Sequence, residues 1–248
     1  MGPSEGLFGG LGLREHHRHG PALPGLLPGA LTRKLAAKLY VYGLLGPALM
    51  STDNRATSEF FDQLTNELLA LRVLAQQRFR PLSPEVLNRR PSPGRWSVGQ
   101  CLEHLNIVGG HYLPEISARV TKALADGSRP APTAKHGFMG RRFIEAMRTP
   151  ASKRTFSSPE RYAPTGTRLP RTVTEVFSRQ LDELLRLVLL ARQVNANSVR
   201  IPNPLFPLLR LRLTDQLEFL VVHIQRHVAQ AEAVLQHQSV SIGDRAAQ

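Results

Sequence analysis

The sequence predicts an all-α protein built as a four-helix bundle, with a long insertion between the second and third helices. Four segments carry apolar residues at the three- and four-residue spacing of a helix that buries one face. The second segment opens with Ser97 and has Gln100 three residues later, which is the capping-box pattern of a helix start. Hydrophobic residues make up 42% of the chain, enough for one core.

The four helices are expected in the following order. The first runs from Asp53 to Phe79, and prolines then lead to the second, from Val98 to Ala125. The third covers Thr172 to Val194. The fourth covers Leu211 to Gln238, with Thr214 as its N-cap.

Around the bundle (50–238) the composition predicts three further segments. Residues 1–49 are rich in Gly, Pro, Leu and His, which predicts a low-complexity, disordered extension or an over-extended start of the chain. The insertion occupies 126–171, and 239–248 read as a polar tail. A loop as long as the insertion is usually functional or disordered. We therefore expect it either to cover a functional pocket of the bundle or to be a solvated tether.

The formal charge of +13 is concentrated in this insertion. Residues 126–171 hold ten Lys and Arg against Asp126, Glu145 and Glu160. Such a surface attracts phosphates and anionic substrates at low salt, although a bias toward Arg on a solvated surface explains it equally well. The insertion also carries four aromatic residues, but no nucleic-acid-binding motif accompanies them, and we do not expect a nucleic-acid partner.

Two simple features bear on the compartment. One cysteine excludes an internal disulfide, which fits a reducing cytoplasm. No run of 18 or more apolar residues occurs, so we expect no membrane span. The prediction is a cytoplasmic protein.

A histidine pair in the fourth helix is the strongest chemical signal. His223 and His227 are four residues apart, so both imidazoles leave the same face of a helix, among apolar neighbours. Two neutral imidazoles at this spacing can hold one metal ion. The alternative is a pair of hydrogen-bonded core histidines.

His104, on the second helix, is the best third ligand. Three protein ligands with an open position are typical of a catalytic rather than a structural zinc site, and imidazole also suits nickel, copper and iron. Cys101 lies one turn before His104 and is either a thiol near the metal or a small core residue.

These motifs, taken in order, resemble the DinB-like family, and more closely its YfiT-type hydrolases and its transferases linked to low-molecular-weight thiols such as mycothiol. The resemblance covers about 57–237 and lies in the order of the motifs. They are Trp96-Ser97, Glu103-His104-Leu105, Asn203-Pro204-Leu205-Phe206, His223, Arg226-His227 and Gln230. It implies a four-helix bundle whose His104, His223 and His227 bind a divalent zinc, nickel or iron ion.

The resemblance also implies a function, for which three alternatives remain. A metal-dependent thiol S-transferase comes first, because the thiol cofactor brings its own nucleophile. A metal-dependent hydrolase comes second, because it needs a general base, and both Glu103 and Glu218 lie off the histidine faces. The third is a non-catalytic, stress-linked bundle that binds a metal or small ligand.

Further expectations concern the surroundings of the site. Gln230, Arg226 and His111 are candidates for orienting a ligand histidine or contacting a small-molecule substrate. Bundles of this kind often pair, so a homodimer is also expected.

Overall fold

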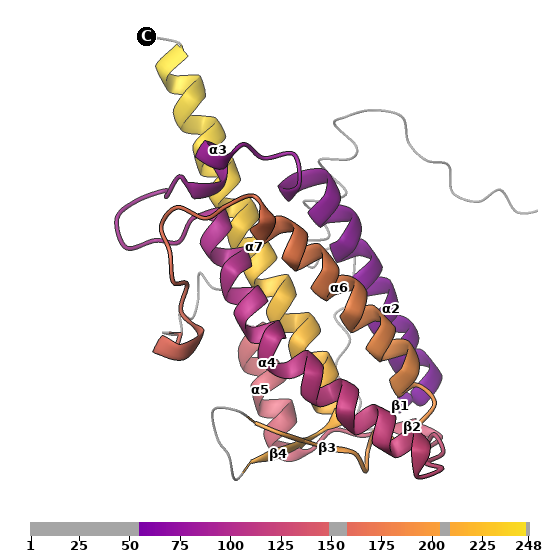
Figure 1. Ribbon diagram of the computed structural model, residues 1–248. Helices are drawn as coiled ribbons and strands as arrows, with labels where there is room; N and C mark the ends of the chain where they lie inside the picture. Colours follow the sequence, from indigo (N-terminus) through magenta and orange to yellow (C-terminus); the bar gives the residue numbers. More distant parts are fainter. Residues whose placement is uncertain (1–54, 149–157, 204–208, 247–248) are drawn as a thin grey trace, which may run out of the picture.

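Four long helices lie side by side in the computed structural model, which describes residues 55–148, 158–203 and 209–246, with only the backbone for 240–246 (Figure 1). They are α2 (Thr57–Leu74), α4 (Val98–Ala125), α6 (Thr172–Ala191) and α7 (Leu213–Ala246). Helix α4 packs against α6 and α7, and α2 packs against the same two helices. The predicted all-α four-helix bundle is therefore confirmed.

Local sequence chemistry explains where these helices begin. Ser97 caps α4 by accepting from the Gln100 N–H, while Gln100 Oε1 accepts from the Ser97 N–H, so the predicted capping box is present. The observed bounds of α4 match the predicted ones. Helix α2 starts at Thr57 rather than Asp53 and continues through a π-helical turn, Ala75–Phe79, to the predicted end. Apolar stripes on all four helices meet in one core.

Several short elements complete the fold. Strands β1 (Arg55–Ala56) and β2 (Thr133–Ala134) form one antiparallel pair, and β3 (Arg200–Pro202) and β4 (Arg210–Arg212) form another. Both pairs lie at one end of the bundle (Figure 1). The sequence did not predict them, because strands of two or three residues are too short to show alternation. The short helices are α3 (Pro84–Asn88), α5 (Phe138–Arg148) and the 3₁₀ turn η2 (Glu160–Tyr162).

The last helix differs from its predicted bounds at both ends. It begins at Leu213, because Leu211 already belongs to β4. Thr214 is consequently not the N-cap: it lies inside the first turn, and its hydroxyl donates to the Lys135 carbonyl at 2.8 Å. The helix ends at Ala246 rather than Gln238, so the backbone of most of the expected tail is helical. The predicted extension, 1–49, lies outside the described residues.

The described parts of the insertion lie against the bundle rather than away from it. Helix α5 packs along α7, and η2 packs against α4. Gly140 permits the close approach of α5, because a Cβ at this position would lie 2.5 Å from Asp215 Cβ. Within the described ranges, no helix has an apolar stretch that could cross a bilayer.

Candidate metal centre

The structure brings three histidines from two helices together. His104 comes from α4, and His223 and His227 come from successive turns of α7. One ring nitrogen from each lies within 4.8 Å of those of the other two. The Nε2 atoms of His104 and His223 are 3.2 Å apart. Among the described residues, no other Cys, His, Asp or Glu joins this group.

Hydrogen bonds fix the direction in which two of the rings face. His104 donates its Nδ1–H to the carbonyl oxygen of Tyr162 at 2.7 Å, so its Nε2 carries no proton and has a free electron pair. His227 donates its Nδ1–H to Gln230 Oε1 at 3.0 Å, with the same result. His223 Nδ1 is buried without a hydrogen-bond partner among the described atoms. Two of the three rings thus present Nε2 to the centre of the cluster.

The cluster is electrostatically neutral. Burial, followed by the charges of the neighbouring His104 and Arg226, lowers the pKa of His223 to about 3. Burial, followed by the charges of His223 and His104, holds the pKa of His227 well below its usual value. Burial also lowers the pKa of His104, against the opposing effect of its bond to Tyr162. Neutral imidazoles are the form that binds metal.

This donor set fits a divalent transition metal. Zinc–nitrogen bonds of about 2.0–2.1 Å place two tetrahedral ligands about 3.3 Å apart. The 3.2 Å between His104 Nε2 and His223 Nε2 is close to that value. Three nitrogen ligands leave a fourth position open, which is the arrangement of catalytic zinc sites.

Aromatic rings surround the three imidazoles. The Trp96 ring lies 5.1 Å from His104 and stacks on His227 at 5.8 Å, between ring centroids. The Phe219 ring stacks on His223 at 5.6 Å, with 7° between the planes. Phe219 precedes His223 by one turn of α7, so the helix itself positions this contact. These rings give the site apolar walls.

Of the residues that were predicted to surround the metal ligands, some contact the histidine cluster and others lie away from it. Gln230 contacts His227, as described above. Arg226 reaches α5 and donates to the Met147 carbonyl at 3.4 Å. His111 is exposed and lies outside the cluster, with its ring edge against Tyr162 at 5.2 Å. Cys101 is a core residue, and burial raises the pKa of its thiol to about 12, so the chain offers no thiolate there.

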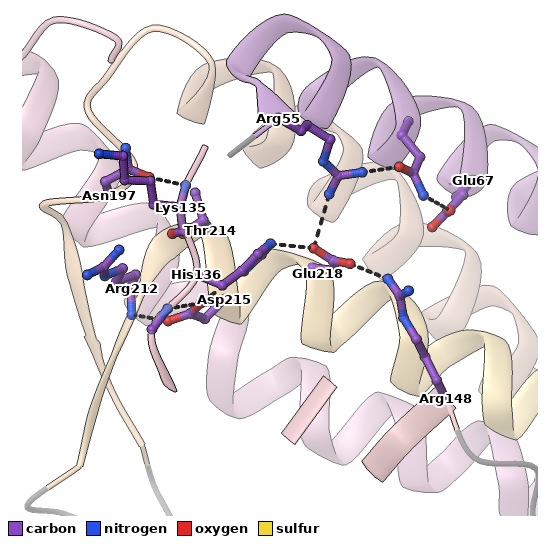
Figure 2. Close-up of polar contacts among 12 residues, drawn as sticks. Arg55, Glu67, Lys135, His136, Arg148, Asn197, Arg212, Thr214, Asp215 and Glu218 are labelled. Atoms are coloured by element: carbon purple, nitrogen blue, oxygen red, sulfur yellow. Dashed lines mark hydrogen bonds and ion pairs between the residues drawn. The ribbon is translucent and has the colours of Figure 1, made fainter. Parts of the chain in front are cut away.

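Both acidic residues that we considered as general bases have other partners. Glu103 accepts from the N–H and hydroxyl of Thr165. Glu218 contacts His136 Nε2 at 2.9 Å and Arg55 at 3.2 Å, and also pairs with Arg148 (Figure 2). As the sequence predicted, neither carboxylate faces the histidines.

Glu218 belongs to a second cluster, the His136 network, in which the buried side chains of His136, Asp215 and Glu218 meet Arg55 and the exposed Arg148 (Figure 2). Burial lowers the pKa of His136, but its hydrogen bonds to Asp215 and Glu218 outweigh this and raise it to about 9. Burial raises the pKa of Glu218, and His136 and the two arginines more than reverse the effect. The imidazole here is a cation between carboxylates.

Two features of these clusters were absent from the sequence prediction. The carbonyl of Tyr162 has no sequence signature, because any residue supplies one. The His136 network did leave a signal: Asp215 and Glu218 stand three residues apart in an otherwise apolar helix. Buried carboxylates need cationic or hydrogen-bonding partners, so the pattern called for a partner elsewhere in the chain.

Comparison with known proteins adds one finding. The family profile described as the DinB superfamily matches residues 67–231, which run from within α2 to within α7 and include all three clustered histidines. No curated protein and no solved structure matches the chain.

Proposed function

The chain belongs to the DinB superfamily, and we propose that it is a metal-dependent thiol S-transferase whose divalent ion is held by His104, His223 and His227. The observation that carries the proposal is the convergence of three neutral imidazoles without a fourth protein ligand among the described residues. A bound divalent ion would supply positive charge that lowers the pKa of a thiol or water at the open position.

The chain's own residues favour transfer from an external thiol. Its one cysteine is buried and protonated, so the nucleophile has to come with a low-molecular-weight thiol. The sulfur forms a bond to an electrophilic carbon, the leaving group departs with its electron pair, and the thiol proton passes to solvent. Trp96 and Phe219 offer apolar surface to the electrophile.

A hydrolase is the second candidate within the same superfamily. Hydrolysis needs a base that takes a proton from the attacking water. Glu103 and Glu218 are both occupied with other partners, which makes the site better suited to a thiol than to water. The homodimer remains a prediction.

Metal content tests the first half of the proposal. We expect about one equivalent of metal per chain by elemental analysis of protein purified without a histidine tag. We expect none in the double variant His223→Ala, His227→Ala. His237→Ala is the matched control, since it removes an exposed histidine from the same helix. A parent protein without metal under metal-replete expression would refute the site.

Turnover tests the second half. The metal-loaded protein is mixed with a panel of low-molecular-weight thiols and an aryl halide, and conjugate formation is followed by mass spectrometry. We expect conjugation with at least one thiol in the parent and in His237→Ala, but not in the double variant. Ester hydrolysis without thiol conjugation would favour the hydrolase. Metal without either reaction would favour a binding protein.

A further inference from the structure

A hollow of about 470 Å³ lies at the end of the bundle that carries the strands. Its walls come from the segment around β2, from the turn after α6, and from β3 and β4. His104 lies near the start of α4, whereas the hollow lies past the end of this helix, at Ala125. The intervening stretch of helix is about 30 Å long. The hollow is therefore separate from the histidine cluster.

The charges that the described residues bring to this hollow are all positive. Among those residues, Lys135, Arg200 and Arg212 line it, and no carboxylate does. None of these three side chains forms an ion pair with any described residue. Asp215 is close by, but it accepts from His136 and from the backbone N–H groups of Gly137 and Arg212.

Strand register holds two of the cations together. Arg200 and Arg212 are directly opposite each other in the antiparallel β3–β4 pair. Their neighbours Ile201 and Leu211 are buried, so alternation turns both arginines to the other face. Like charges directly opposite are destabilising unless an anion lies between them.

The third cation sits on an anchored segment. Asn197 Oδ1 accepts from the Lys135 N–H at 2.8 Å, and Thr214 donates to the Lys135 carbonyl at 2.8 Å (Figure 2). The Asn197 amide also donates to the Thr133 carbonyl at 2.8 Å. Ser198 bonds back to the Asn195 carbonyl at 2.9 Å, which orders the turn after α6. The walls are thus set without a ligand.

We propose that this hollow is a binding site for a small phosphorylated molecule, held by Arg200, Arg212 and Lys135. Guanidinium groups match the geometry of phosphate oxygens with paired N–H donors, and lysine adds a point charge. A volume of about 470 Å³ falls in the range of small-ligand pockets. The site is independent of the histidine cluster and of the reaction proposed there.

Calorimetric titration with inorganic pyrophosphate at low salt tests the site. We expect saturable binding to the parent, weakened at least tenfold in the double variant Arg200→Ala, Arg212→Ala and less in Lys135→Ala. The control is Arg168→Ala with Arg179→Ala, which removes two exposed arginines that form no ion pair with described residues. This control should bind within twofold of the parent, and unchanged affinity in Arg200→Ala, Arg212→Ala would overturn the proposal.

Two further arms separate other sources of binding. Pyrophosphate also binds metal ions, so His223→Ala with His227→Ala must retain the parent's affinity; its loss there would overturn the proposal. A single-stranded oligonucleotide that binds the parent more tightly than pyrophosphate at equal phosphate concentration would overturn it in favour of a nucleic-acid surface. Removing Arg200 and Arg212 relieves repulsion, so the melting temperature of that variant should not fall.

Discussion

Helix α7 carries two buried histidine environments that have opposite charge states. Around His223 and His227, imidazoles face imidazoles, and burial lowers the pKa of each ring. At the start of the same helix, Asp215 and Glu218 surround His136 from the insertion, whose pKa rises to about 9. Glu218 lies about 140° around an ideal helix from His223, so the two clusters occupy different faces.

The comparison shows that burial alone does not determine what a histidine does. Without carboxylate partners, a buried imidazole loses its proton and keeps a free electron pair, as a metal ligand must. With two carboxylates it keeps the proton and becomes one part of an ion network that joins the insertion to β1 and α7. The first arrangement suits chemistry, and the second suits structure.

Removing Glu218 should have the largest effect on stability. Glu218→Ala leaves His136, Arg55 and Arg148 without their shared carboxylate. The effect is large because the Glu218 side chain is only 3% exposed. Breaking a buried ion network by removing one partner costs about 3–5 kcal/mol of unfolding free energy. Denaturant unfolding followed by circular dichroism measures it.

Glu183→Ala is the matched control for Glu218→Ala. Glu183 pairs with Arg186 on the surface of α6, where a pair is worth less than about 1 kcal/mol. The folded fraction of Glu218→Ala should still bind metal, because the histidine cluster lies on another face of α7. A loss below about 1 kcal/mol for Glu218→Ala would show that the network is not a structural clamp.

Alkaline pH should weaken the His136 network. The folded-state pKa of His136, about 9, exceeds the unfolded value of 6.5. Its contribution is therefore fully present below pH 6.5 and is lost as the pH rises through about 9, for a total of about 3 kcal/mol. Unfolding free energies at pH 6, 7.5 and 9 should fall in that order. His136→Gln should flatten the slope, and a parent whose stability rises over this range would contradict the assignment.

A smaller effect is expected where α5 approaches Asp215. Gly140→Ala places a Cβ against the Asp215 side chain and should cost about 1–3 kcal/mol by overpacking. Gly110→Ala is the control, because nothing lies within 4 Å of a Cβ there. Alanine inside α4 should stabilise by about 0.5–1 kcal/mol. Thermal unfolding distinguishes the two cases, because the melting temperature should fall for Gly140→Ala and rise for Gly110→Ala. Equal shifts in melting temperature would mean that α5 can move away from α7.

Most of the bundle was predictable, because helical periodicity and capping are local properties. The bounds of α4 follow from Ser97, Gln100 and the apolar stripe that comes after them. The pairing of His223 with His227 is equally local, while the approach of His104 follows only once the bundle is assumed. Neither the Tyr162 carbonyl nor the partnership of His136 with Glu218 could be predicted, since both depend on where the insertion folds back.

Gln230 offers the finest test of the contrast between the two clusters. Its Oε1 accepts the Nδ1–H of His227 at 3.0 Å and so keeps Nε2 available, much as Asp215 and Glu218 fix the ring of His136. Gln230→Ala should weaken zinc affinity by about tenfold, or about 1.4 kcal/mol, without loss of fold. Competition with a chromogenic chelator measures it. Gln230→Glu retains an acceptor oxygen and should restore most of the affinity, whereas equal affinities in all three proteins would mean that α7 packing alone orients His227.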